Sequence, residues 1–281
     1  MRAACWKGWR KRNDDKAQYS RKGGPRTTVE EQYRTAGNLE ARIALHRDFS
    51  ANPQGWACWV AAQYDLRPGM AALELGCGNG LIWRARTEEL PHGLRLVLSD
   101  RSTGMLETAR KNTQTLANTT YQVIDAQEIP YPDHSFDAVM ANHMLYHVPD
   151  LPKALGEIAR VLKPGGVLYA TTLGRENLRE LWEILAGFDP EIDWGQSALA
   201  EVFGLETGGA KLAPYFSEVE LRRYPDHLHV TRAQPLADYV LSQEGVAARQ
   251  GEAFAQYLEE IIARRGAIDI RKDAGMFLAR K

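Results

Sequence analysis

The sequence contains few cysteines, no long apolar run and almost no net charge, and each of these shortages excludes a class of protein. Its 3 cysteines in 281 residues are too few and too scattered for a disulfide framework or a zinc site. No apolar run approaches the roughly 18 residues that cross a bilayer. The basic amino terminus is not followed by the apolar stretch of a secretory signal. We therefore expect a soluble cytoplasmic protein with no membrane partner.

The charge balance gives no reason to expect a nucleic-acid partner. The 35 Lys and Arg residues are matched by 36 Asp and Glu residues, so the formal net charge is −1, whereas nucleic-acid-binding domains usually carry a basic surface. Residues 1–27 are the exception, since they are basic and polar. We expect them to form a flexible tail, although Trp6 and Trp9 leave open a segment that closes over the site or reaches a partner subunit.

A glycine-rich stretch at residues 73–80, Leu-Glu-Leu-Gly-Cys-Gly-Asn-Gly, follows a short apolar run and precedes a predicted helix. Strand, glycine turn and helix are typical of a nucleotide-binding loop, because glycine permits a tight turn and close approach of a ligand. The dinucleotide fingerprint G-x-G-x-x-G is not met, since Leu81 stands at its third glycine. Glu74, two residues before the first glycine, suits a cationic ligand better than a pyrophosphate.

Two further acids stand at the ends of predicted strands. Residues 94–100 read as a strand that ends in Asp100, about 20 residues after the last glycine, where a carboxylate can accept from both ribose hydroxyls of an adenosine ligand. The alternative for Asp100 is a helix N-cap. Residues 120–126 read as the next strand, with Asp125 near its end.

These stretches together resemble the class I S-adenosylmethionine-dependent methyltransferases, whose first motif reads (L/V)-(D/E)-x-G-x-G-x-G, and among them the small-molecule, type 11-like members. The string Ala-Arg-Val-Leu-Lys-Pro-Gly-Gly-Val-Leu at residues 159–168 is also similar to the family. The resemblance is strong over residues 66–173. It implies an α/β fold with a Rossmann-like, seven-stranded, mostly parallel sheet, helices on both faces and an N-terminal helical lid. Five parallel strands would be followed by a hairpin-like pair.

The resemblance also implies a domain division and a set of cofactor contacts. Residues 28–65 would form an N-terminal helical cap, and residues 66–281 the methyltransferase domain, with an accessory insertion at about 174–215. The cofactor would be S-adenosyl-L-methionine and the product S-adenosyl-L-homocysteine. The residues implied to bind the cofactor are Glu74, Gly76, Cys77, Gly78, Asn79, Gly80, Asp100, Arg101, Met105, Asp125, Ala126, Gln127, Asn142 and His143.

His147 and Tyr33 are the candidate catalytic residues. His147 follows the strand predicted at residues 136–141, at the edge where open α/β sheets bind ligands. A histidine can accept a proton near neutral pH, and some small-molecule members of the family pair one here with a tyrosine from the amino-terminal segment. The alternatives are that His147 caps the next helix or packs under the cofactor, and that Tyr33 is a surface residue. No Glu stands beside His143 as in H-E-x-x-H, so we expect no metal.

The implied reaction is in-line transfer of the sulfonium methyl group to an O, N or C nucleophile of a small organic molecule. Such a reaction needs no catalytic triad, because the protein chiefly aligns the reacting atoms. Two alternatives remain: an RNA or protein methyltransferase, supported only by the basic tail, and a non-catalytic S-adenosylmethionine-binding module. The Asn-Pro-Pro-Tyr motif of amino-group nucleic-acid methylators is absent, because Asn142 precedes His-Met-Leu. We expect a small-molecule acceptor, no nucleic acid, and a monomer or homodimer.

Overall fold

The computed structural model describes residues 36–85, 90–191, 196–242 and 250–281, which divide into two compact units. The larger unit comprises Trp59–Asn177, Gly195–Tyr224 and Asp273–Lys281, and the smaller comprises Met1–Cys58, Leu178–Trp194 and Pro225–Lys272. Each unit has a hydrophobic core of its own. Within the described ranges, no helix is long and apolar enough to span a membrane. The predicted tail, residues 1–27, lies outside these ranges.

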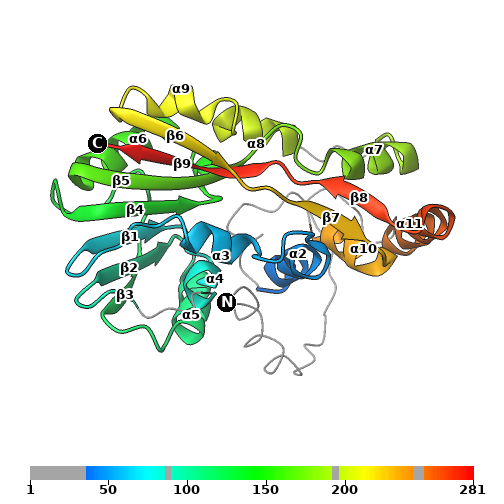
Figure 1. The fold of residues 1–281 in the computed structure, drawn as a ribbon, viewed down its shortest axis with the longest axis horizontal. Coiled ribbons are helices and arrows are strands. Elements are labelled where there is room, and N and C mark those ends of the chain that lie inside the picture. Colours follow the sequence, from blue (N-terminus) through cyan, green and yellow to red (C-terminus); the bar gives the residue numbers. More distant parts are fainter. Residues whose placement is uncertain (1–35, 86–89, 192–195, 243–249) are drawn as a thin grey trace. The chain divides into compact units, whose positions relative to one another are not determined.

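A seven-stranded sheet forms the centre of the larger unit, in the order β3-β2-β1-β4-β5-β9-β6 (Figure 1). Strand β9 runs antiparallel to both of its neighbours, and the other neighbouring pairs are parallel. The predicted seven-stranded, mostly parallel sheet is therefore confirmed. The strands are β1 Ala71–Leu75, β2 Arg95–Asp100, β3 Thr119–Val123, β4 Phe136–Asn142, β5 Leu162–Leu173, β6 Glu218–Arg223 and β9 Ala274–Arg280.

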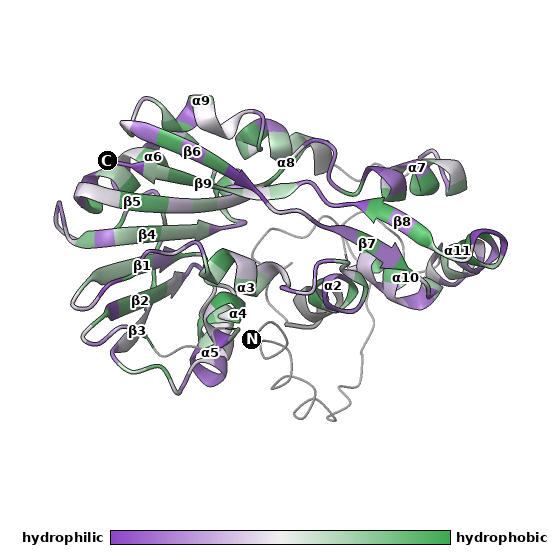
Figure 2. Ribbon diagram, in the orientation of Figure 1, coloured by the Kyte–Doolittle hydropathy of each residue, from purple (hydrophilic) through white to green (hydrophobic). Residues whose placement is uncertain are grey.

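The order of the strands reverses at β1. The chain builds β2 and β3 on one side of β1 and then crosses to place β4 and β5 on the other side. Loops at the carboxyl ends of β1 and β4 diverge at such a switch point and leave a crevice in which open α/β sheets bind ligands. Figure 2 shows that the strands at this position, β1 and β4 among them, consist mainly of apolar residues. The topology alone therefore places a ligand site after β1, β2 and β4.

Helices pack on both faces of this sheet. Helices α6 (Leu151–Val161), α8 (Gln196–Phe203) and α9 (Gly208–Leu212) lie on one face, and α4 (Leu81–Arg84) and α5 (Thr103–Asn112) on the other. The alternation of side chains along β1 sets this arrangement. Leu73 and Leu75 pack in the core that includes Leu155 of α6, whereas Glu74 points to the opposite face and contacts Trp83 of α4. Helix α3 (Trp56–Ala61) precedes β1.

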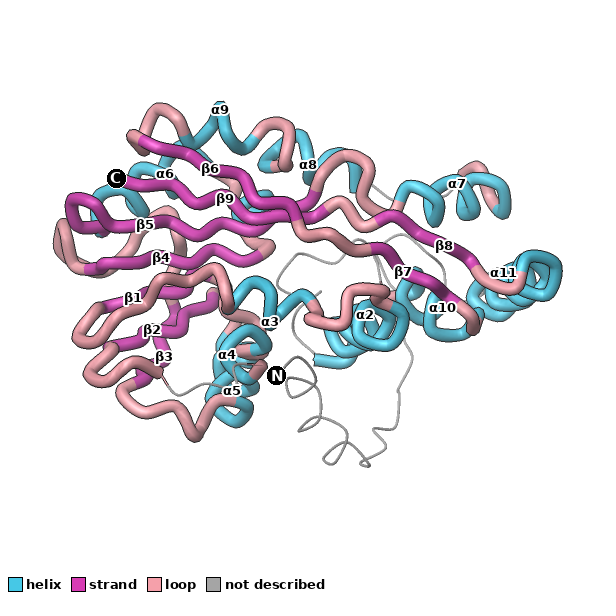
Figure 3. Tube along the Cα trace, viewed as in Figure 1, coloured by secondary structure: helices cyan, strands magenta, loops and turns pink. Residues whose placement is uncertain are grey.

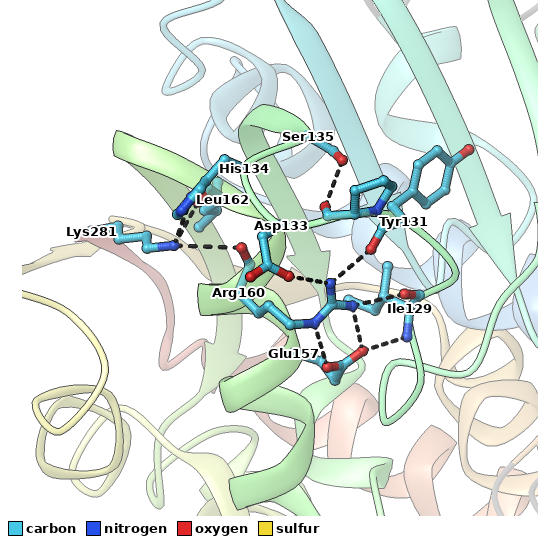
Figure 4. Close-up of polar contacts among 10 residues, drawn as sticks. Ile129, Tyr131, Asp133, His134, Ser135, Glu157, Arg160, Leu162 and Lys281 are labelled. Atoms are coloured by element: carbon cyan, nitrogen blue, oxygen red, sulfur yellow. Dashed lines mark hydrogen bonds and ion pairs between the residues drawn. The ribbon is translucent and has the colours of Figure 1, made fainter.

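Arg160 of α6 fastens the loop between β3 and β4 to the helix (Figure 4). Its guanidinium group donates to the carbonyl oxygens of Ile129 (2.9 Å) and Tyr131 (2.8 Å). It also donates to the carboxylates of Asp133 (2.9 Å) and Glu157 (2.7 and 2.8 Å). The hydrogen bond to Glu157, followed by that to Asp133, raises the pKa of Arg160. This part of the family-like string at residues 159–168 thus has a structural role.

In its described residues, the smaller unit combines four helices with a two-stranded antiparallel sheet (Figure 3). Its core contains Leu45, Leu181, Leu236 and Leu258, one from each helix, together with Ile270 from the sheet. Its elements are α2 Ala36–Phe49, α7 Arg179–Phe188, β7 His227–Val230, α10 Ala233–Leu241, α11 Gly251–Arg265 and β8 Ile268–Arg271.

The closing strand pair differs from a hairpin. Strands β6 and β9 are antiparallel neighbours in the sheet, as expected. Between them in sequence, however, residues 225–272 belong to the smaller unit and include β7 and β8. The alternation in residues 227–230 and 268–271 is too short to indicate a strand by periodicity, and these segments form a sheet because they pair with each other.

Candidate functional site

The loop from β1 to α4 has a left-handed backbone at three glycines. The φ angles are +66° at Gly76, +55° at Gly78 and +75° at Gly80, a region that residues with a Cβ rarely adopt. A Cβ atom on Gly76 would lie 2.9 Å from the Cβ of Met144. Glycine is therefore required at Gly76 for two reasons, the turn itself and the close approach of the segment that follows β4.

Hydrogen bonds to neighbouring strands hold the loop in place. The amide of Cys77 donates to the carbonyl oxygen of Ser99 (2.8 Å), and the amide of Gly78 donates to a carboxylate oxygen of Asp100 (2.9 Å). The side-chain oxygen of Asn79 accepts from the amide of Leu81 (3.1 Å) at the start of α4. Burial raises the pKa of the Cys77 thiol, which disfavours the thiolate form in which cysteine acts as a nucleophile.

Asp100 joins the glycine loop to the end of β2. One carboxylate oxygen accepts from the amide of Gly78, and the other accepts from the amide of Ser102 (2.9 Å). Helix α5 is capped by Ser102, whose hydroxyl accepts from the amide of Met105 (3.3 Å), so Asp100 is not its N-cap. The Asp100 carboxylate is half-buried, and burial raises its pKa. Each of its oxygens keeps acceptor capacity for a ligand hydroxyl.

Asp125, Gln127 and Arg101 come together beyond the ends of β2 and β3. Asp125 accepts from the amide of Gln127 (2.9 Å) and from its side-chain nitrogen (3.0 Å). The Arg101 guanidinium lies 3.9 Å from the other Asp125 oxygen. Burial raises the pKa of Asp125, but the Gln127 hydrogen bonds and the Arg101 charge together lower it below its usual value. Ala126, between them, is buried.

Glu74 and Asn142 form a buried polar cluster between β1, β4 and α4. The Glu74 carboxylate accepts from the side-chain nitrogen of Asn142 (2.7 Å) and from the indole N–H of Trp83. The same Asn142 nitrogen donates to the hydroxyl oxygen of Tyr64 (2.8 Å). Glu74 is 1% exposed, and burial raises its pKa to about 7. Sequence reasoning did not predict Trp83 and Tyr64, although a buried indole N–H needs a polar partner.

The segment after β4 brings the rings of His143 and His147 close to the ring of Tyr146. The rings of His143 and Tyr146 lie 6.3 Å apart, and those of Tyr146 and His147 lie 4.6 Å apart. His143 adopts φ +50°, a strained conformation for a non-glycine residue, which is common at functional sites. His147 ends the 3₁₀ helix Leu145–His147.

The structure decides whether His147 caps the next helix, but it does not test the predicted pairing of His147 with Tyr33. Helix α6 is capped by Asp150, whose side chain accepts from the amide of Lys153 (3.0 Å), so His147 does not cap it. Tyr33 lies outside the described residues.

Comparison with known proteins agrees with this geometry. Residues 73–170 match the family model described as methyltransferase domain. The chain is 34% identical over 161 residues to the malonyl-[acyl-carrier protein] O-methyltransferase of Serratia marcescens, an alignment that covers 56% of this chain and 57% of that protein. It is 30% identical over 185 residues to the demethylmenaquinone methyltransferase of Symbiobacterium thermophilum, covering 60% of this chain and 69% of that protein.

The fold is shared with solved structures as well. The phosphoethanolamine N-methyltransferase 2 of Haemonchus contortus, in complex with S-adenosyl-L-methionine, superposes with a TM-score of 0.54 at 20% identity, covering 88% of this chain and 57% of that one. The chain spans little more than half the length of the Serratia relative and about two thirds of the Symbiobacterium one. Its sequence and fold show that it belongs to the class I S-adenosylmethionine-dependent methyltransferases.

Proposed function

We propose that this chain transfers a methyl group from S-adenosylmethionine to an O, N or C nucleophile of a small organic molecule. The observation that carries the proposal is the gathering of Asp100, Asn142 and the left-handed glycine loop at the carboxyl ends of β2, β4 and β1. The relatives support an organic acceptor, since one is named for malonyl-[acyl-carrier protein] and another for demethylmenaquinone.

The described residues suit an adenosine-bearing ligand. Asp100 offers two carboxylate oxygens for the ribose hydroxyls, and Asp125, Ala126 and Gln127 offer an acceptor and amides for the adenine edge. Glycines 76, 78 and 80 let a ligand approach the backbone without a Cβ in the way. When bound, the cofactor supplies an activated methyl group and its own leaving group. The chain then has to hold the acceptor in line, which can lower the barrier by several kcal/mol.

His147 is the proposed proton acceptor for a nucleophile that arrives protonated, and Tyr33 is its proposed partner. His147 lies at the end of a 3₁₀ helix just after β4 and stacks edge-on against Tyr146. Its ring is half-buried, so it is accessible to a substrate. Replacing His147 by Ala should lower kcat by about 10²-fold for such an acceptor and leave S-adenosylmethionine binding unchanged. An unchanged kcat would exclude this role.

Calorimetric titration of the wild type and of Asp100→Ala with S-adenosylmethionine and with NADH tests the proposal. We expect the wild type to bind S-adenosylmethionine and not NADH. Asp100→Ala should bind S-adenosylmethionine at least about tenfold more weakly, because it loses hydrogen bonds from a charged acceptor. Asp133→Ala, which removes an exposed carboxylate that precedes β4 and accepts a hydrogen bond from Arg160, is the matched control. Failure of the wild type to bind S-adenosylmethionine would contradict the proposal.

A further inference from the structure

A side chain at the end of β5 holds the chain at the point where it leaves β4. The amide of His143, the first residue after β4, donates to the carbonyl oxygen of Thr171 (3.2 Å) and to its hydroxyl oxygen (3.0 Å). The bond to the carbonyl oxygen continues the parallel pairing in which Asn142 lies opposite Thr171. The bond to the hydroxyl oxygen is an additional one, which an apolar side chain could not make.

The residue held in this way has a strained backbone. His143 has φ +50°, in the left-handed region that residues with a Cβ rarely adopt. Such a conformation persists only where the surrounding structure determines it. The strain and a buried hydrogen bond have free energies of the same order. The Thr171 hydroxyl therefore decides, together with the carbonyl oxygen, which conformation His143 adopts.

The conformation of His143 sets the direction of the short helix that follows. The 3₁₀ helix Leu145–His147 is held internally by the amide of His147, which donates to the carbonyl oxygen of Met144 (2.9 Å). The apolar side chain of Leu145 anchors the helix in the core of the larger unit. The hydrogen bonds at His143 are its polar anchor. Because a change in one backbone dihedral angle rotates everything that follows it, loss of the polar anchor turns the helix about the apolar one.

Three aromatic rings depend on the direction of this helix. The ring centroids of His143 and Tyr146 lie 6.3 Å apart, and those of Tyr146 and His147 lie 4.6 Å apart. All three residues are half-buried, so each keeps surface that a ligand can contact. A turn of the helix displaces the rings of Tyr146 and His147 together.

We propose that Thr171 is a positioning residue for the methyl acceptor. Its hydroxyl oxygen holds His143 in the left-handed conformation, and His143 in turn sets where the rings of Tyr146 and His147 lie against the acceptor. The inference rests on the proposed function, in which His147 accepts a proton from the acceptor, and adds the residue that keeps His147 in place. Thr171 is 0% exposed and therefore acts through His143 and not by contact.

Thr172, the next residue of β5, is a matched control for this role. It is also completely buried, and its hydroxyl donates to the carbonyl oxygen of Phe203. Successive side chains of a strand point to opposite faces of the sheet, so Thr172 lies on the face away from the Thr171 hydroxyl. Replacing either threonine by valine keeps the shape and removes one buried hydrogen bond. Both variants should lower the urea midpoint, but only Thr171→Val should displace the rings.

Nuclear magnetic resonance of the histidine rings measures this displacement without an acceptor. The protein is labelled at histidine Cε1, and the signals of His143 and His147 are assigned with His143→Gln and His147→Gln. Each signal depends on its distance from the Tyr146 ring, whose π-electrons shift nearby protons. At one fixed pH, both signals should move in Thr171→Val and stay in place in Thr171→Ser and Thr172→Val. Unmoved signals in Thr171→Val, or equal movement in Thr172→Val, would overturn the inference.

Methyl transfer provides the second measurement. Release of S-adenosylhomocysteine is followed with a panel of phenols, aliphatic amines and β-dicarbonyl compounds as acceptors. For an acceptor that the wild type methylates, Thr171→Val should lower kcat by about tenfold or more, because acceptor and base are misaligned. Its affinity for S-adenosylmethionine should be unchanged, and Thr171→Ser and Thr172→Val should keep the wild-type kcat. A wild-type kcat in Thr171→Val, or an equal loss in Thr172→Val, contradicts the inference.

A second variant decides the matter if Thr171→Val does not fold. Thr171→Cys keeps a side chain of similar size and replaces the hydroxyl by a thiol, which is a weaker acceptor. It should move the signals of His143 and His147 away from their wild-type positions, and unmoved signals would refute the role of the hydroxyl. If the wild type does not bind S-adenosylmethionine or methylates no acceptor, the proposed function fails. If the wild type is active and the signals do not respond, only the inference fails.

Discussion

The buried Glu74 side chain links the stability of the protein to pH. Its carboxyl is held between Trp83 and Asn142 on the face of β1 that packs against α4. Burial there raises its pKa from 4.5 to about 7, so the folded protein without ligand holds a proton at a pH where the unfolded chain has released it.

The sign of the effect predicts a pH-dependent stability. Because the folded pKa of Glu74 lies above the unfolded one, its contribution is fully present below pH 4.5 and is lost as pH rises through about 7. The loss amounts to roughly 3 kcal/mol. Compared with the wild type, Glu74→Gln should therefore become relatively more stable as pH rises from 5 to 8, measured by urea unfolding without ligand.

Asp125 provides a control of opposite sign. Its folded pKa is lowered by Gln127 and Arg101 despite burial. Its contribution is therefore present above its unfolded pKa and is lost as pH falls through its folded value. Asp125→Asn should be less stable to unfolding than the wild type near neutral pH, and this difference should disappear only in acid. The same pH trend for both variants would show that the Glu74 assignment is wrong.

The glycine loop is the element on which the site depends, because both its own backbone conformation and the neighbouring segment after β4 restrict which residues it can contain. Its φ values are ones that residues with a Cβ rarely adopt, and the Gly76 Cα faces Met144 from the segment after β4. The loop and that segment are therefore fitted to each other as well as to a ligand. Backbone strain and the steric clash both add to the free energy that an alanine at Gly76 would cost. The two can be separated by comparison with a glycine that has a positive φ but no close neighbour.

Gly69 is that comparison. Its φ is +77°, and a Cβ there would meet no atom within 4 Å. Gly69→Ala should cost about 1 kcal/mol of unfolding free energy, the strain alone. Gly76→Ala should cost about 2 kcal/mol or more, since the Cβ of Met144 must also move, and should weaken S-adenosylmethionine binding. Chemical denaturation and calorimetry measure both, and equal costs at the two positions would contradict the steric argument.

At the scale of the whole molecule, a buried ion pair joins the two ends of the segment of residues 225–272. Asp226 lies near its start and Lys272 at its end, 2.7 Å apart between charged atoms, with side chains 0% and 6% exposed. Asp226 also accepts from Ser50 (2.5 Å) and from the amide of Asn52 (2.9 Å). The pair thus ties both ends of the segment to the end of α2 within the smaller unit.

Breaking this pair should destabilise the smaller unit. Asp226→Asn should cost about 3 kcal/mol, because Lys272 is left buried without its partner charge. Glu260→Gln, at an exposed pair in which Arg264 lies 3.8 Å away, should cost less than about 0.5 kcal/mol. Hydrogen exchange of the α10 and α11 amides measures the loss. Similar effects of the two variants would mean that the pair contributes little.

The sequence by itself determined the features that depend on neighbours along the chain. The apolar run that forms β1, the glycines at 76, 78 and 80, and the acid at the end of β2 are local features of the sequence, and the seven-stranded sheet that the family resemblance implied is the one observed. The capping of α5 by Ser102 is equally local, and the alternative of Asp100 as its cap was decided by one hydrogen bond.

Only the tertiary structure decided what depends on residues far apart in sequence. Glu74 meets Asn142 across 68 positions and Asn142 meets Tyr64 across 78, so no periodicity could predict that the acid is buried and accepts from an amide. Strand β9 lies between β5 and β6 in the sheet, although 50 residues that include β7 and β8 separate it from β6 in the sequence. Long-range pairing is selected by burial and hydrogen bonding in the folded chain, and a local pattern contains neither.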